Sequence, residues 1–213
     1  MRARGIDPGA TIGWCDVECV SAGVFRYVAS GTWEASRFEP CTRGGGIPEL
    51  GAIEIVCVET PKEMHPNEVR AQLAHPATLV QTIRSLITTA ALAERLAAEA
   101  DGMCRRVMQP TAAEVRHELG VRLGGQRGRG PKLTVDQQIA KIIPLAIRGW
   151  PTRSNTHVRD AAAAALWALQ QAELGEAIRR APHEAARGFT IPPPGTYGPG
   201  DYGPDSFGGS DFG

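Results

Sequence analysis

The chain has 213 residues, 42% of them hydrophobic, which suffices for one compact domain with a sizeable core and is typical of a globular protein. It has no uninterrupted apolar run of about 18 residues, and its N-terminal MRARGIDPG lacks the apolar segment of a secretory signal. We therefore expect no membrane partner and a cytoplasmic location. The net charge is zero, but residues 182–213 hold four acids and one base, so the remainder keeps 22 of the 23 basic and 19 of the 23 acidic residues. A polyanionic partner is not excluded by this balance.

The first sixty residues carry strand patterns. Segments 11–20 and 24–33 are rich in β-branched and aromatic residues, and Gly5–Asp7 predicts a short strand before them. Ala52–Val58 is an apolar run with one interruption, which is typical of a central strand buried on both faces. Pro61 favours extended backbone before it, so this strand should end there.

Helical patterns dominate after Pro61. Pro76 can occupy the first turn of a long helix that ends at about Asp101, and Met103–Gln109 is predicted as a strand. The apolar stripe of the long helix consists of Leu79, Val80, Ile83, Leu86, Ile87 and Ala90.

Two capping boxes predict two further helix starts. Thr111 with Glu114 begins a short helix that stops at Gly120, and Thr134 with Gln137 begins another that Pro144 should kink or shorten. Between them lies a glycine-rich basic loop, residues 120–132. A polar turn, PTRSNTH, precedes a final helix over roughly Val158–Arg179.

The order of these elements predicts an α/β fold with a mixed central sheet flanked by helices, because strands come first and then alternate with helices. We assign residues 1–181 to this domain. Residues 182–213 are dominated by Gly, Pro, Asp and aromatic residues, which cannot bury enough apolar surface to offset their ordering entropy. They are predicted to form a disordered tail.

Four residues are candidates for chemistry. Asp7 closes a predicted strand before a sharp Pro-Gly turn, and a carboxylate at the C-terminal end of a central strand faces the crevice where α/β sheets bind ligands. A turn aspartate is the ordinary alternative. Glu59 repeats the arrangement of strand, acid and proline. His157 and Asp160 are three residues apart at a helix start, so their side chains share one face.

Two strand-end carboxylates with a His-x-x-Asp pair supply hard oxygen ligands and one imidazole. Such a set suits Mg²⁺, for which Mn²⁺ can substitute. Two ions about 4 Å apart can clamp the attacking and leaving oxygens of an in-line phosphoryl transfer. Asp7 would bridge the two ions, and metal-bound water would serve as the nucleophile.

Four sequence motifs in order resemble those of the RuvC family of Holliday junction resolvases. GIDPGATIGW is similar to the first strand and turn of that family, and VCVETP to the strand that carries its second acid. VMQPTAAEVRHELG, with Lys132 and LTVDQQIAKII after it, is similar to the stretch that links the fifth strand to the next helix. THVRDAAAAALWAL is similar to the last motif, and the match runs from about Arg4 to about Leu169.

The resemblance implies a ribonuclease H-like fold and a homodimeric, Mg²⁺-dependent endonuclease that nicks two strands of a four-way DNA junction symmetrically during recombination and repair. It implies Asp7, Glu59, His157 and Asp160 as catalytic groups and metal ligands. Branch-migration or replication proteins are further candidate partners. The DNA-backbone contacts would be Arg116 and Lys132, extended by the loop arginines Arg122, Arg127 and Arg129.

Some features depart from the RuvC pattern. Better-known members place an aromatic residue just after the second acid, where this chain has Thr60 and Pro61. Flaps, forks or RNA–DNA hybrids are therefore alternative substrates for a nuclease of the same fold. Glu54 is a rival for the second acid, and we prefer Glu59 because a buried strand cannot easily hold Glu54. An ATP-binding or non-enzymatic relative rests only on the DPGATIG turn.

Overall fold

The computed structural model describes residues 1–38, 47, 50–61, 73, 76–103, 106–121 and 133–188, with the backbone alone for Pro76 and residues 178–188. In chain order, the elements are β1 (Arg2–Asp7), β2 (Thr11–Ser21), β3 (Val24–Glu34), a 3₁₀ turn η1 (Ala35–Phe38), β4 (Ile55–Val58), α2 (Pro76–Asp101), β5 (Arg106–Met108), α3 (Ala112–Glu118), α4 (Val135–Ala146), β6 (Ile147–Arg148) and α5 (Thr156–Gly188).

The chain divides into two compact units, Met1–Leu174 and Gly175–Gly213, and the boundary falls inside α5. Residues 182–188 of the predicted tail are helical, and residues 189–213 lie outside the described residues. The first unit holds the sheet and both core clusters. No helix in the described part of the chain is long and apolar enough to span a bilayer.

The six strands form one mixed sheet in the order β5-β4-β1-β2-β3-β6. Strands β1, β2 and β3 are antiparallel neighbours, whereas β4 runs parallel to β1, and β5 parallel to β4. This order and these directions are those of the ribonuclease H-like fold, so the predicted fold class is confirmed. The short β6, which was not predicted, adds a parallel edge strand beside β3.

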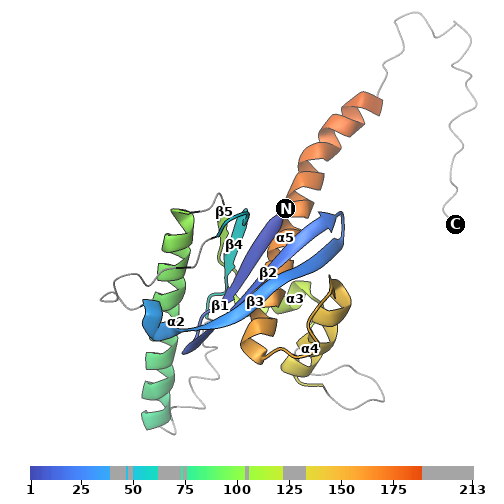
Figure 1. Cartoon of the computed structure of the whole chain (residues 1–213). Helices are drawn as coiled ribbons and strands as arrows, with labels where there is room; N and C mark the ends of the chain where they lie inside the picture. Colours follow the sequence, from blue (N-terminus) through green and yellow to red (C-terminus); the bar gives the residue numbers. More distant parts are fainter. Residues whose placement is uncertain are drawn as a thin grey trace, which may run out of the picture. The chain divides into compact units, whose positions relative to one another are not determined.

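Helices cover both faces of the sheet (Figure 1). On one face, Ile6, Val56 and Val58 pack with Leu96 and its neighbours on α2. On the other face, buried residues of β1, β2 and β4 pack with α3, α4 and α5. Because successive side chains of a strand alternate between faces, odd-numbered residues of both β1 and β4 point toward α5.

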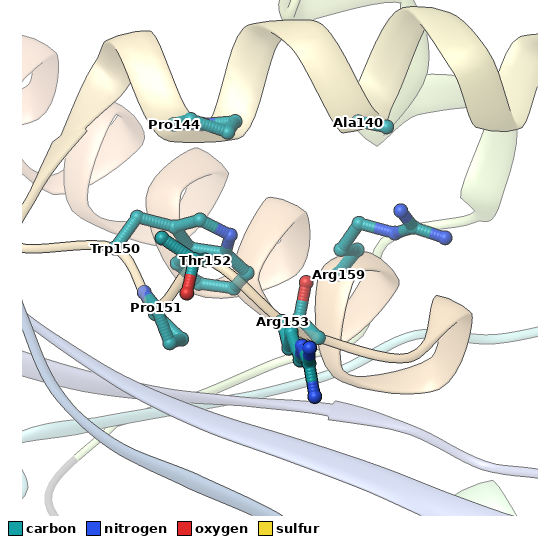
Figure 2. A pocket seen from close by; sticks show the side chains of 8 residues that line it. Ala140, Pro144, Trp150, Pro151, Thr152, Arg153 and Arg159 are labelled. Carbon is teal, nitrogen blue, oxygen red and sulfur yellow. The ribbon is translucent and has the colours of Figure 1, made fainter.

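Local sequence explains why α3 and α4 begin where they do. Thr111 and Thr134 each accept a hydrogen bond from the third residue of their helix, and Glu114 and Gln137 bond back to the cap residues. Both predicted capping boxes are thus confirmed. Pro144 lies inside α4, which ends two residues later at Ala146, and Figure 2 shows its ring opposite the segment that follows β6.

Other predicted boundaries shifted. The buried strand is shorter than Ala52–Val58, because residues 51 and 52 form a turn and β4 begins only at Ile55. The final helix is longer than Val158–Arg179, because it starts at Thr156 and its Ala- and Arg-rich end continues to Gly188 despite Pro182.

Helix α5 lies unusually close to the sheet at two glycines. A Cβ atom on Gly5 would lie 1.8 Å from the backbone oxygen of Ala161, and one on Gly13 would lie 2.2 Å from the backbone oxygen of His157. No side chain larger than hydrogen fits at either position. The alanine run of α5, which is buried from Ala161 to Ala165, permits the same close approach from the helix side.

We predict that Gly13→Ala will push α5 away from β2. Overpacking of a core commonly costs about 1–3 kcal/mol, and the upper part of that range is expected because the clash is with backbone. The free energy of unfolding in urea measures the loss. Gly175→Ala is the control, since nothing lies within 4 Å of its added Cβ atom. A Gly13→Ala protein as stable as the Gly175→Ala protein would contradict this packing.

Candidate active site

Asp7 and Glu59 lie at the same edge and on the same face of the sheet. Ile6 pairs with Val58 in the parallel β1–β4 register, and the backbone N–H of Glu59 donates to the carbonyl of Ile6 (2.9 Å). The two carboxylates therefore follow the C-terminal ends of neighbouring parallel strands. Both have odd numbers, so they share the α5 face.

The first turn of α5 brings His157 to Asp7. Asn155 caps this helix, because its side-chain oxygen accepts a hydrogen bond from the backbone N–H of Val158 (2.8 Å). The backbone of His157 rests against Gly13, which is the β2 partner of Asp7. The Nδ1–H of His157 donates to Oδ2 of Asp7 at 2.8 Å. The imidazole stays 45% exposed, whereas the Asp7 side chain is 17% exposed.

Electrostatic coupling places Asp160 with the other two carboxylates. Burial, followed by the charges of Asp7 and Asp160, raises the pKa of Glu59 from 4.5 to about 8. Burial, followed by the charge of Asp7, raises the pKa of Asp160 to about 6. Burial also raises the pKa of Asp7, although the hydrogen bond from His157 opposes the shift. Such crowding of carboxyl groups is common at functional sites.

Arg116 is the cation that faces this group. Its positive charge lowers the pKa of Asp7, of Glu59 and of Asp160, so it lies within range of all three. It comes from α3, whose Val115 is fully buried in the core beside it. The resemblance to the RuvC family implied a DNA-backbone contact for Arg116, which stays a prediction.

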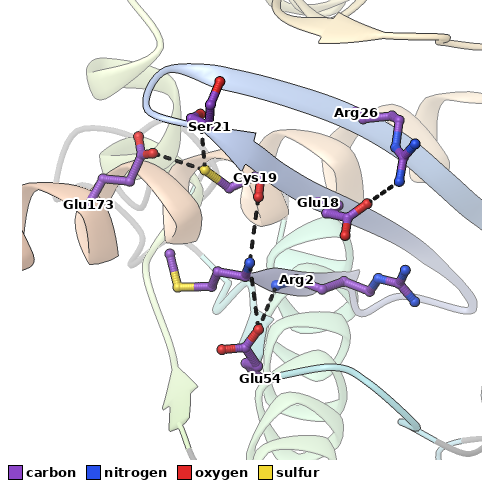
Figure 3. A network of polar contacts seen from close by, with 8 residues as sticks. Arg2, Glu18, Cys19, Ser21, Arg26, Glu54 and Glu173 are labelled. Carbon is purple, nitrogen blue, oxygen red and sulfur yellow. Dashed lines mark hydrogen bonds and ion pairs between the residues drawn. The ribbon is translucent and has the colours of Figure 1, made fainter.

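Glu54, the rival for the second acid, lies at the other end of β4. It precedes Ile55, which pairs with Ala3 near the start of β1. Its carboxylate accepts a hydrogen bond from the backbone N–H of Arg2 (3.3 Å) and lies 3.6 Å from the N-terminal ammonium group (Figure 3). The structure therefore groups Glu59, and not Glu54, with Asp7.

Most of the predicted DNA-binding residues fall outside the described part of the chain. These are the loop residues Arg122, Arg127, Arg129 and Lys132. Their assignment stays a prediction from sequence. Arg116 is the member of that set whose place in the fold is described.

The donor chemistry of the site fits a hard divalent cation. Three carboxylates and one imidazole are oxygen-rich ligands of the kind that Mg²⁺ and Mn²⁺ prefer. A cation among carboxyl groups with raised pKa values would relieve their mutual repulsion and displace their protons. Among the described residues, however, no group of three or more His, Cys, Asp or Glu side chains lies close enough together to hold an ion as arranged.

Some residues that build the site were not singled out from the sequence. Asn155 caps α5 within the segment expected to be a polar turn, and an asparagine two residues before His157 was the available signal. Gly13 gave no local signal, because its role depends on a helix that lies about 140 residues away in sequence. Asp136 on α4 also raises the pKa of Asp160.

No family model matches the chain, and no curated protein matches it. Among solved structures, it is similar to T. thermophilus RuvC in complex with a Holliday junction substrate, with 17% identity, a TM-score of 0.48, and coverage of 82% of this chain and 96% of that chain. A second structure of Thermus thermophilus RuvC gives 19% identity, a TM-score of 0.41, and coverage of 82% and 97%. The order and directions of the strands identify the fold without these comparisons.

We predict that the metal-free protein loses stability as pH rises from about 5 to 8. A carboxyl group whose pKa is raised by folding holds its proton in the folded state where the unfolded state has released it, so this loss spans the window between 4.5 and about 8 for Glu59. Glu59→Gln removes the largest contribution. At pH 8 its melting temperature should exceed that of the wild type by about 2–4 °C for each 1 kcal/mol regained.

Thermal unfolding in chelator across this pH range measures the difference. Glu54→Gln, which changes an acid at the other end of β4, should keep the wild-type pH dependence. Equal pH slopes for Glu59→Gln and the wild type would show that Glu59 is not forced to ionise in a buried, negatively charged site.

Proposed function

We propose that this protein is a metal-dependent endodeoxyribonuclease that cuts branched DNA, with the Holliday junction as its principal substrate. The observations that carry the proposal are the hydrogen bond between Asp7 and His157 and the electrostatic coupling of Asp7 with Glu59 and Asp160. These residues come from three of the four motifs that resemble the RuvC family. A carboxylate-rich site beside Arg116 is suited to a phosphodiester, because the carboxylates attract the cation and the arginine attracts the phosphate.

Each side chain has a distinct part in the proposed reaction. Asp7, Glu59 and Asp160 would hold Mg²⁺, which would supply charge stabilisation for in-line hydrolysis, and the protein would need no covalent nucleophile of its own. His157 keeps its Nδ1–H on Asp7, which leaves the lone pair of Nε2 to accept a proton from the attacking water. Arg116 would orient the phosphate. The half-exposed imidazole is the group that a DNA strand can reach.

A homodimer would match the two-fold symmetry of a four-way junction. An exposed apolar stripe on the N-terminal half of α2 supports it: Val80 is 48% exposed, Ile83 41% and Ile87 64%, and Leu73 just before α2 is 58% exposed. These residues repeat at intervals of three, four and seven, which places them on one side of a helix. Such a stripe is typical of a surface that a second helix covers.

A second substrate class rests on one observation. Thr60, whose side chain donates to the carbonyl of Pro110 (3.1 Å), stands where an aromatic residue would engage the centre of a junction. A site without that aromatic residue can also accept flaps, forks or RNA–DNA hybrids. Relative rates on these substrates decide between the two classes.

We predict that the purified protein with Mg²⁺ nicks a synthetic four-way junction in two strands of like polarity. Asp7→Asn should lower the nicking rate by about a hundredfold or more, because it removes a ligand charge, while junction binding in a mobility-shift assay is retained. Glu54→Gln should cut at the wild-type rate. An Asp7→Asn protein that cuts normally would refute the proposed site.

The same assay tests the proposed dimer. Ile87→Glu places a charge in the apolar stripe, so its two nicks on one junction should become uncoupled while each single nick still forms. If Ile87→Glu nicks both strands in the same coupled manner as the wild type, the stripe is not the dimer surface.

A further inference from the structure

A pocket of about 580 Å³ lies between α4 and the N-terminal part of α5, the helix that also carries His157 and Asp160. We call it the Trp150 pocket. One wall is formed by Ala140 and Pro144 of α4, and the opposite wall by Trp150, the segment that follows it, and Arg159 (Figure 2). Arg159 and Asp160 are consecutive residues of α5, so the pocket and the carboxylate of Asp160 involve the same part of that helix. Its size is in the range that accommodates a small organic ligand.

The pocket is positively charged. Its eight lining residues include Arg153 and Arg159 and no carboxylate. Arg153 is exposed, whereas Arg159 is half-buried and donates from its guanidinium group to the hydroxyl of Thr156 (3.2 Å). That bond holds Arg159 over the first turn of α5. Planar guanidinium groups at the mouth of a pocket are suited to the phosphates of a nucleic acid.

The same pocket offers an aromatic surface. The indole of Trp150 is half-buried and packs edge-to-face with Tyr27 at a ring distance of 5.7 Å, which fixes its orientation. In Figure 2 its ring lies between Pro151 and the Pro144 side of α4. Because Pro144 has no N–H, the carbonyl of Ala140 cannot receive the usual helical hydrogen bond from that residue.

We propose that the Trp150 pocket receives one nucleotide of the cut strand next to the scissile phosphate, with its base on the Trp150 indole and its flanking phosphate on Arg153 and Arg159. The inference rests on the proposed nuclease function and adds a subsite to it. Aromatic stacking accepts any base, so the subsite positions the strand whatever its sequence.

A double-mutant cycle between protein and DNA tests the stacking. Trp150→Leu removes the ring and keeps an apolar side chain against Tyr27. Abasic substitutions are placed singly at the positions that flank the mapped nick. One of them should weaken binding to the cleavage-blocked Asp7→Asn protein by about fivefold or more. In the Asp7→Asn protein that also carries Trp150→Leu, the same abasic site should cause no further loss of binding affinity, because the two changes remove one interaction.

The matched control is Trp167→Leu. Trp167 also lines a pocket, of about 450 Å³, but two glutamates, Glu114 and Glu118, stand beside it. In the Asp7→Asn protein that carries Trp167→Leu and keeps Trp150, the abasic site should therefore still lower the binding affinity by its full factor. Circular dichroism of each variant confirms that it is folded before binding is measured.

The salt dependence of binding tests the phosphate contact. Arg153→Gln should lower the slope of log affinity against log salt by about 1, since one phosphate contact is lost. Arg26→Gln, which changes an arginine paired with Glu18 on the β2–β3 hairpin, should leave the slope unchanged. A purely structural role for Arg153 would alter affinity without altering the slope.

The outcomes separate the two levels of the proposal. A wild-type protein that neither binds nor cuts any branched DNA overturns the proposed function and this inference with it. A second outcome overturns the Trp150 pocket alone. The wild-type protein cuts, the abasic site lowers affinity equally with and without Trp150, and Arg153→Gln leaves the salt slope unchanged. Loss of the abasic cost in Trp150→Leu with a reduced slope in Arg153→Gln establishes it.

Discussion

The backbone contact of α5 with Gly5 and Gly13 is the constraint on which the candidate site depends. Helices usually pack on sheets through side chains. At Gly5 of β1 and Gly13 of β2, however, only the hydrogen atoms of the glycines separate the sheet from α5. Gly13 is the partner of Asp7 in the sheet and touches the backbone of His157. The same contact that seats the helix therefore delivers its first turn, with His157 and Asp160, to the end of β1. An added methyl group would disturb packing and site together.

The electrostatics of the site follow from this geometry. Asp7 and Glu59 end parallel neighbouring strands, and Asp160 joins them from α5, so three acids share one partly buried region beside Arg116. Burial, followed for Glu59 and Asp160 by the charges of neighbouring acids, raises their pKa values, and these shifts represent free energy that folding spends on burying the three groups. A protein stabilised elsewhere by two apolar layers can carry that cost. In the proposed function, a bound divalent cation would offset this cost by neutralising the charge of the three acids.

Sequence patterns predicted the parts of the fold that local chemistry determines. Both capping boxes, the long helix from Pro76 and the strand-end positions of Asp7 and Glu59 depend on residues close together in the chain. The His157–Asp160 spacing predicted a shared helix face, but the partner of that face depended on Gly13, which carries no local signal. The edge strand β6 was missed because its two residues are defined by pairing with Phe25 and Arg26. Tertiary contacts, and not propensity, decide such elements.

Anomalous diffraction from crystals grown with Mn²⁺ tests most directly whether these residues form a metal-dependent site. The account predicts a manganese peak bound by a carboxylate oxygen of Asp7 and by oxygens of Glu59 or Asp160, and its loss in Asp7→Asn crystals. Mn²⁺ bound elsewhere, or a peak at this position that persists in Asp7→Asn, would contradict the central claim that Asp7 anchors the metal centre.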